Sequence, residues 1–266
     1  DGRMSTLHPL EDGPARLWRL AQRRALGWAR IVYLGAVVLV LLLSPSTYCG
    51  AARTRLAHHM VRATLPVLPG FTALAALVSL SITRIVVVTA QSYGLSRYAL
   101  EMVVRVLVLE LIPLTAALFV ALRCSIPQGL ELARLRAAGH LDRLRRQGAD
   151  PVRMELLPRV LAGAYAGITL AALSCVVALA MAYLGVYGAS LAGLPGYTRM
   201  FGQVFTPAFT LVFVLKTLFS SLAVALIPTA SALHPGPGMT ELGGLARMFA
   251  LLLLIELVSL MGNYYG

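Results

Sequence analysis

The fold is decided by residues 103–122, VVRVLVLELIPLTAALFVAL, and by the charged segment that follows them at residues 128–159. The apolar run contains only two charged side chains, Arg105 and Glu110, and has the length of about 20 residues that a helix needs to cross a bilayer. The charged segment cannot remain in hydrocarbon, because each buried charge is costly there. The stretch therefore predicts a membrane-spanning helix that leads into a polar connection outside the membrane.

Four further apolar runs extend this pattern along the chain. They cover residues 65–90, 160–186, 208–233 and 245–261. The composition agrees, since 58% of the 266 residues are hydrophobic and 13% are charged, whereas about a quarter of a soluble domain is charged. The mean hydropathy is +0.78. The sequence predicts an all-α membrane protein with five transmembrane helices.

The residues before these runs have a different pattern. Residues 15–30 mix arginines with Leu, Ala and Trp, which is typical of an amphipathic helix lying in a membrane interface. The apolar run at 31–43 is too short for a full crossing, and whether it enters the bilayer stays open. We expect residues 1–64 to form an N-terminal tail and interfacial or re-entrant elbow helices, and residues 65–266 to form one five-span domain.

Arginines predict the orientation. The chain has 23 basic and 11 acidic residues, a net charge of +12. Seven arginines lie within 128–159, but only one lies in each of the connections 91–101 and 188–207. The positive-inside rule places the 128–159 segment and the N-terminus in the cytoplasm, and five crossings then place the C-terminus outside. Because the arginines lie between apolar runs, they indicate contact with anionic headgroups and not with nucleic acid.

The charged segment 128–159 has an internal pattern of its own. Leucines alternate with charges over residues 128–147, which predicts an amphipathic helix. Gly148 is placed to end that helix, and Asp150 and Pro151 are placed to begin the next one. Two interpretations remain open: an ordinary charged loop, or a helix parallel to the membrane that fits a partner's groove.

Catalytic and metal-binding patterns are missing from the sequence. It contains no Walker A, GxSxG or HExxH motif. The adjacent His58 and His59 point about 100° apart on a helix, so they do not form a metal site. The three cysteines, Cys49, Cys124 and Cys175, are widely spaced and fit buried apolar thiols. We expect no enzymatic activity and no cofactor in this chain.

A series of short motifs crosses the second apolar run and the charged segment. It comprises Leu109-Glu110-Leu111-Ile112-Pro113, Ala121, Arg123, Glu131, Arg136, Gly148, Asp150, Pro151, Pro158 and Arg159. In residue type and spacing these motifs resemble the MlaE-type permeases of mammalian-cell-entry (MCE) ABC transporters. Lys216 stands at the family's intramembrane lysine, and Glu256 stands in for its late aspartate. Leu109, Ile112 and Gly139-His140 depart from the family pattern and indicate a divergent member.

The resemblance implies a homodimeric permease subunit of the bacterial inner membrane. A cytoplasmic ATPase subunit, which would bind ATP and Mg²⁺, would dock on the coupling helix between the second and third spans. The transporter would move phospholipid or a related lipid to or from an MCE-domain protein on the outer side. The residues expected to couple to the ATPase are Glu131, Arg134, Arg136, His140, Arg143, Gly148, Asp150 and Pro151. A secondary transporter and a non-transporting scaffold remain the alternatives, although the chain shows no inverted repeat.

Several charged side chains lie inside the apolar runs or at their ends. They are Arg84, Arg105, Glu110, Arg123, Lys216 and Glu256. A charge near the bilayer centre costs on the order of 2.5 kcal/mol or more, so it usually faces a cavity or a partner charge. Snorkelling to the interface is the alternative for Arg105 and Arg123. We expect Glu110, Lys216, Arg105 and Glu256 to hold a lipid headgroup or to form a charge network at the cavity.

Two glycines, Gly163 and Gly167, lie four residues apart in the third apolar run. Small residues at this spacing let two membrane helices approach closely. The approach could occur within one subunit or between two copies, and the sequence does not separate these alternatives.

Overall fold

The computed structural model describes residues 12–43, 51–94, 96–233 and 241–264, and every element in these ranges is a helix. Most of the expected N-terminal tail, Cys49 and the final tyrosine, Tyr265, lie outside the described residues. Five helical stretches are long and apolar enough to cross a membrane, and a shorter apolar helix, Ala25–Leu41, precedes them. The five stretches are Leu68–Ser92, Leu100–Ala137, Val152–Tyr187, Pro207–Leu233 and Gly243–Asn263. The predicted fold class is confirmed.

The second span is the most irregular of the five. It is a continuous stretch built from several helical pieces in which π-helical turns interrupt the α-helix. In order these are α4 (Ser96–Val103), η2 (Val104–Leu111), α5 (Ile112–Val120), η3 (Ala121–Ser125) and α6 (Ile126–Ala137). A π-helical turn carries one extra residue, and such turns are frequent at functional sites.

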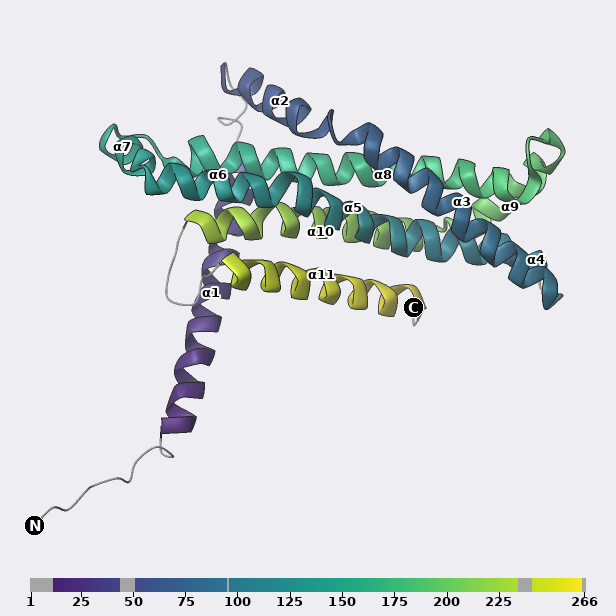
Figure 1. The fold of residues 1–266 in the computed structure, drawn as a ribbon, viewed down its shortest axis with the longest axis horizontal. Coiled ribbons are helices and arrows are strands. Elements are labelled where there is room, and N and C mark those ends of the chain that lie inside the picture. Colours follow the sequence, from purple (N-terminus) through teal and green to yellow (C-terminus); the bar gives the residue numbers. More distant parts are fainter. Residues whose placement is uncertain (1–11, 44–50, 95, 234–240, 265–266) are drawn as a thin grey trace, which may run out of the picture.

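The bundle is organised around α10 (Pro207–Leu233). This helix packs against α5, α6, α8 (Leu157–Tyr187) and α11 (Glu241–Tyr264). On its other side α8 packs against α2 (Ala51–Thr64) and α3 (Leu68–Ser92), so the long helices lie roughly along one direction (Figure 1). The buried apolar core therefore runs between α10 and α8.

Small residues bring α8 and α10 together. A Cβ placed on Gly167 would lie 2.9 Å from the Cβ of Ser221, and one placed on Gly163 would lie 3.0 Å from the Cβ of Ala225. Neither position has room for a side chain without a shift of α10. The glycine pair therefore packs within the subunit, which decides between the two alternatives that the sequence left open.

The N-terminal helix α1 (Asp12–Leu43) crosses the other helices at one end of the bundle (Figure 1). It is one helix through both segments that the sequence distinguished at 15–30 and 31–43. Its buried side chains, Ile31, Leu34 and Val38, recur at helical spacing and join the core. Gly27 lies against the guanidinium group of Arg247 on α11, and Gly35 lies against Leu226 on α10. The apolar face of α1 is thus fixed on the last two spans.

The charged segment lies at the same end of the bundle as α1 (Figure 1). The helix expected over 128–147 is two helices, α6 and α7 (His140–Arg146). The physical reason is Gly139, which has a φ of +72° and breaks the helical hydrogen-bond ladder.

The turn after α7 follows the sequence prediction. Gly148, with a φ of +74°, donates its amide to the Arg145 carbonyl at 3.0 Å, and the amide of Ala149 reaches the Leu144 carbonyl at 3.0 Å. This pair of bonds is a Schellman motif. One carboxylate oxygen of Asp150 then accepts the amide of Val152 at 2.9 Å, just before the π-helical turn η4 (Val152–Leu156) that opens the third span.

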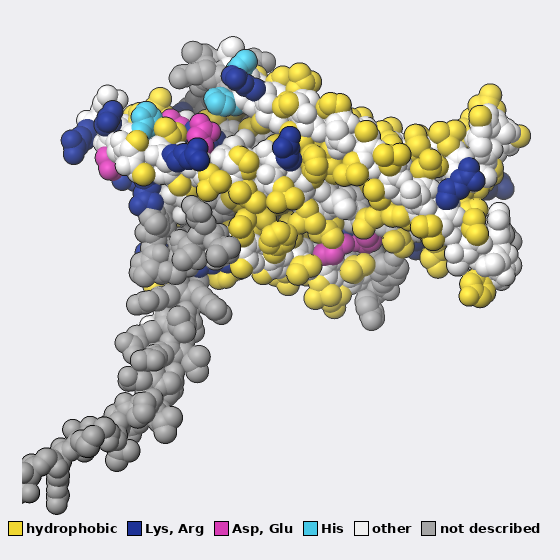
Figure 2. Space-filling model, in the orientation of Figure 1, with side chains coloured by type: hydrophobic (Ala, Val, Ile, Leu, Met, Phe, Trp, Pro, Cys, Tyr) yellow, Lys and Arg dark blue, Asp and Glu magenta, His cyan; other side chains and the backbone are white. Residues whose placement is uncertain are grey.

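The opposite end of the bundle carries α4, the short 3₁₀ turn η5 (Leu191–Gly193) and α9 (Leu194–Val204) (Figure 1). The Tyr197 hydroxyl donates to the Leu179 carbonyl at 2.9 Å and ties α9 to α8. Burial, with a smaller contribution from Cys175, raises the pKa of Tyr197 to about 12, so this donor stays protonated. Figure 2 shows hydrophobic side chains over the middle of the molecule and most of the basic side chains towards its two ends, as expected of a protein that spans a bilayer.

Candidate functional site

The first candidate site begins with the irregular backbone of the second span. Pro113 has no N–H, so it cannot bond the Leu109 carbonyl as the next turn of an α-helix would. That carbonyl oxygen instead accepts a hydrogen bond from Nζ of Lys216 at 3.3 Å. The π-helical turn η2 thus presents both a backbone oxygen and the carboxylate of Glu110 to α10.

Lys216 lies at the centre of this site, and its side chain is 2% exposed. Its ammonium group forms an ion pair with Glu110 and a second one with Glu256 at 2.8 Å. With the bond to Leu109, three acceptors meet the three N–H donors of the ammonium group. No donor of Lys216 is left for a further ligand in this conformation.

Asn263 completes the arrangement. Its Nδ2 donates to the second carboxylate oxygen of Glu110 at 2.8 Å. Glu110, Lys216, Glu256 and Asn263, here called the Lys216 cluster, join the second, fourth and fifth spans. Asn263 was not among the residues expected from the sequence, because an amide at the end of the last apolar run fits an ordinary interfacial residue equally well.

The Lys216 cluster has more acid than base, with two carboxyl groups around one ammonium group. Three polar side-chain atoms on α10 and α11 are buried and have no hydrogen-bond partner among the described residues: Oγ1 of Thr217, Oγ of Ser259 and Oδ1 of Asn263. Glu256, Ser259 and Asn263 are spaced three and four residues apart, so they share one face of α11. Buried polar atoms are usually satisfied, so this face is suited to a polar ligand group.

Arg105 lies apart from the Lys216 cluster, although the sequence placed it there. Its guanidinium group pairs with Glu101 at 3.0 Å, one turn earlier, and lies 5.0 Å from the centre of the Phe209 ring. Arg84 and Arg123 are exposed on the surface of the bundle. Of the intramembrane charges, the structure brings together only Glu110, Lys216 and Glu256 in the part of the chain that it describes.

The second candidate site is the charged segment, and Arg159 ties it to the third span. Arg159 pairs with the carboxylate of Glu155, donates to the Glu155 carbonyl at 2.7 Å and approaches Glu131 on α6 at 3.7 Å. His140 at the start of α7 lies 3.4 Å from the same Glu155 carboxylate. Glu131, His140, Glu155 and Arg159, here called the Arg159 cluster, connect α6 and α7 to the base of α8. The sequence singled out three of them; Glu155 could have been found from its spacing of four residues before Arg159.

A separate set of contacts ties α6 to α10. Arg136 donates from Nη1 to the Ala232 carbonyl at 3.3 Å. A Cβ on Gly129 would lie 3.1 Å from the Pro228 carbonyl oxygen, so the two helices touch through backbone there. Among the other expected coupling residues, Arg134 and Arg143 are exposed, while Gly148, Asp150 and Pro151 form the turn before the third span. The segment therefore presents arginines outwards and is fixed to α8 and α10 inwards.

Comparison with known proteins places these sites in a family. The profile of the family Permease MlaE matches residues 56–261, which include the whole Arg159 cluster and three members of the Lys216 cluster. No curated protein matches the chain. The matched region covers more than half of the chain, including four whole spans and all but the last two residues of the fifth. The chain therefore belongs to the MlaE permease family and is a multi-pass membrane permease component of a lipid ABC transporter.

Proposed function

We propose that this chain is the permease through which an ABC transporter moves phospholipid, or a related lipid, between the bacterial inner membrane and an MCE-domain partner on the outer side. The Lys216 cluster is the observation that carries the proposal. Burying a lysine and two carboxyl groups among membrane spans is costly, and such groups usually belong to a transport pathway. Membership of the MlaE permease family supports lipid as the transported substrate.

The cluster gives a lipid headgroup a polar place within the bundle. In the present conformation Lys216 is fully bonded, so the cluster is closed. Separation of α10 from the second span would free the ammonium group for a phosphate and a carboxylate for an amine headgroup. The polar atoms of Thr217, Ser259 and Asn263 would then contribute further hydrogen bonds.

The charged segment would receive the force that opens the cluster. A cytoplasmic ATPase subunit, which holds the ATP and Mg²⁺, docks on α6 and α7 and contacts the exposed Arg134 and Arg143. Its movement reaches α8 through the Arg159 cluster and α10 through Arg136 and Gly129. Since α6 contacts α10, and α10 carries Lys216, a shift of α6 would move α10 and with it the Lys216 cluster. Two copies of the chain form the working permease.

The test is transport of lipid by the chain reconstituted in vesicles with the ATPase that co-purifies with it. Replacing both charges, Glu110→Gln with Lys216→Met, is expected to reduce ATP-dependent lipid transfer at least tenfold. Arg84→Gln is the matched control, because Arg84 is an exposed charge in a span, and it should leave transfer within twofold. Unchanged transfer in the double variant would contradict the assigned role of the cluster.

The same preparation separates the two alternative functions. Full transport without any ATPase would identify a secondary transporter. Absence of transport, together with a charged segment that binds no partner and intramembrane charges that tolerate substitution, would identify a scaffold. Mass spectrometry of lipid retained by the purified complex would name the lipid class.

A further inference from the structure

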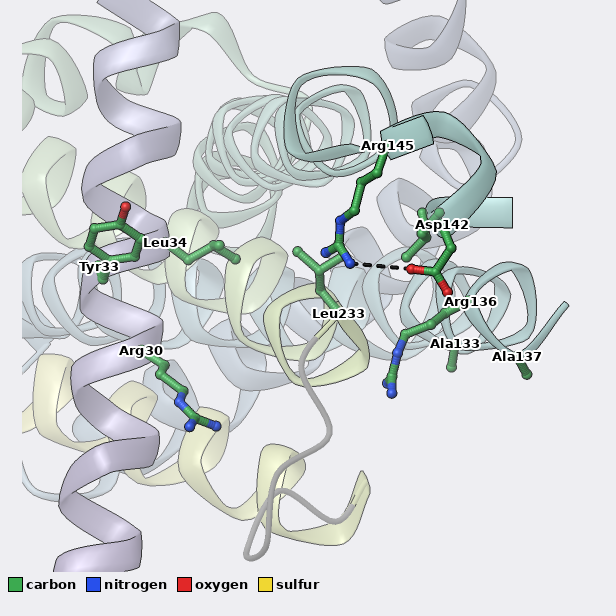
Figure 3. Close-up of a pocket in the computed structure, with 10 residues that line it drawn as sticks. Arg30, Tyr33, Leu34, Ala133, Arg136, Ala137, Asp142, Arg145 and Leu233 are labelled. Carbon is green, nitrogen blue, oxygen red and sulfur yellow. Dashed lines mark hydrogen bonds and ion pairs between the residues drawn. The ribbon is translucent and has the colours of Figure 1, made fainter. Parts of the chain in front are cut away.

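A cavity of about 760 Å³ lies between α1 and the α6–α7 segment (Figure 3). Its size falls within the range of about 300–1,000 Å³ that is typical of small-molecule sites. The walls come from α1, α6, α7 and the last residue of α10, and they combine three arginines with leucines and a tyrosine.

The charge of this cavity is strongly positive. Arg30 forms no ion pair within the described part of the chain, Arg136 makes one bond to a carbonyl, and Arg145 pairs with Asp142 at 3.3 Å. A guanidinium group has five N–H donors, so most of the donors of these arginines remain available. One carboxylate does not balance three guanidinium groups, and a planar guanidinium group matches phosphate in charge and geometry.

The depth of the cavity identifies its surroundings. Leu233, which lines the cavity, is the last residue of the fourth span. The arginines therefore lie beside the end of an apolar span, which is the level of lipid headgroups. Leu34 on α1 and Leu141 on α7 form an apolar wall beside them, and Tyr33 is exposed at the same level.

From these observations we propose that the cavity binds the phosphate group of an anionic phospholipid of the surrounding leaflet. The phosphate contacts Arg30 and Arg145, and the first part of the acyl chains contacts Leu34 and Leu141. A bound lipid would link α1 to the α6–α7 segment, since its phosphate meets arginines from both. The site is distinct from the Lys216 cluster, and an excess of positive charge favours an anionic lipid over a zwitterionic one.

The test uses the purified full chain in a mild detergent. Native mass spectrometry and the thermal unfolding midpoint are recorded with phosphatidylglycerol, with phosphatidylcholine and with inorganic phosphate. Phosphatidylglycerol is expected to raise the midpoint most, because a ligand that binds only the folded state stabilises it. Equal stabilisation by inorganic phosphate would show that a free anion, and not a lipid, is the ligand; equal binding of both lipids would overturn the proposal.

Variants locate the site. Arg30→Gln with Arg145→Gln should weaken phosphatidylglycerol binding by about tenfold or more, since the pair of substitutions removes the charge-assisted hydrogen bonds to the phosphate. Arg146→Gln with Arg199→Gln removes the same charge outside the cavity and should leave binding within twofold. Arg30→Lys with Arg145→Lys keeps the charge, so it should retain part of the binding and shows that the cavity is intact. Equal losses in both glutamine pairs would overturn the proposal.

Two further outcomes separate this site from other roles of the chain. Glu110→Gln with Lys216→Met should retain binding at this cavity, so failure of the proposed transport role is distinguishable from failure of this site. If the Arg30 and Arg145 substitutions abolish binding of the ATPase but leave lipid binding unchanged, the cavity belongs to a protein interface and the lipid proposal is overturned.

Discussion

At the scale of single residues, the Lys216 cluster makes a strong prediction about stability. Lys216→Met leaves the buried Glu110 and the half-buried Glu256 without their cation, and removing one partner of a buried ion pair typically costs about 3–5 kcal/mol. We expect a loss of about 3 kcal/mol in the free energy of unfolding, measured by titration with SDS in mixed micelles. Glu110→Gln should lower the free energy of unfolding much less in the Lys216→Met variant than in the wild type, because the two residues interact.

The control for this prediction is a charge that has no ion-pair partner among the described residues. Arg84 is exposed in the first span, and Arg84→Met should change the free energy of unfolding by less than about 0.5 kcal/mol. If Lys216→Met and Arg84→Met prove equally harmless, the cluster contributes nothing to the stability of the fold.

A second residue-scale prediction concerns the contact between α8 and α10. Gly167→Ala places a methyl group 2.9 Å from the Cβ of Ser221, and overpacking of this kind typically costs about 1–3 kcal/mol. Gly202→Ala on α9 is the matched control, because a Cβ there meets nothing within 4 Å. Ser221→Gly should recover most of the stability lost in Gly167→Ala. A variant that keeps its stability but no longer dimerises would place the glycine at a subunit interface instead.

Part of the residue-scale picture could be predicted from the sequence. Intramembrane charge is expensive, so Glu110, Lys216 and Glu256 were recognisable as residues with partners. Which charges meet depends on how separate spans pack, and hydrophobic runs contain little information on packing. Arg105 shows the difficulty, because its nearest carboxylate is Glu101 in its own helix and not the distant Glu256. The spacing of four residues between Glu101 and Arg105 was the local signal for that pair.

At the scale of helices, the charged segment is predicted to have separate docking and transmission residues. Arg134 is exposed on α6, whereas Arg159 is 13% exposed and connects α6 and α7 to α8. Arg134→Gln should weaken binding of the ATPase subunit without changing transport per bound complex. Arg159→Gln should leave binding within about twofold and lower lipid transfer per ATP hydrolysed several-fold. Binding affinity and transport stoichiometry, measured on the same complexes, check both expectations.

Parallel losses in the two variants would contradict this division of roles. Loss of binding and transfer together in Arg159→Gln would mean that the Arg159 cluster holds the docking surface in shape. Arg159→Lys retains the charge but not the two-pronged geometry of a guanidinium group. Its lipid transfer per ATP hydrolysed should therefore lie between the values for the wild type and for Arg159→Gln.

The break between α6 and α7 shows a limit of sequence patterns at this scale. The sequence over 128–147 mixes leucines with charges on both sides of Ala137-Ala138-Gly139, so the composition is helical over most of its length. A glycine within such a pattern lowers helix stability by only about 1 kcal/mol, so Gly139 alone does not predict a break. Contacts beyond α6 and α7, including His140 with Glu155, accompany the left-handed conformation. Gly148 was predictable because Asp150 and Pro151 follow it closely.

At the scale of the whole molecule, the lengths of the apolar runs were sufficient to predict the five spans but not the shape that the spans form. Each apolar run of about 20 residues became a span, and the second and third spans extend well beyond their runs into amphipathic sequence. The crossing of α1 over the end of the bundle was not predictable, because an amphipathic helix with a short apolar part fits several positions in an interface. Its place follows from contacts of Gly27 and Gly35 with residues more than 190 positions away.

The shape of the molecule also makes its orientation testable. The α6–α7 segment and α9 lie at opposite ends of the bundle, and arginines concentrate in the first (Figure 1). By the positive-inside rule the α6–α7 end faces the cytoplasm. Single cysteines at Gln147 and at Gly202, in a chain whose native cysteines are replaced by alanine, report on the two ends. A membrane-impermeant maleimide applied to bacterial spheroplasts should label the cysteine at position 202, and should label position 147 only after the inner membrane is permeabilised. Labelling in the reverse order would show that the protein has the opposite orientation in the membrane. The α6–α7 segment would then lie on the side away from a cytoplasmic ATPase.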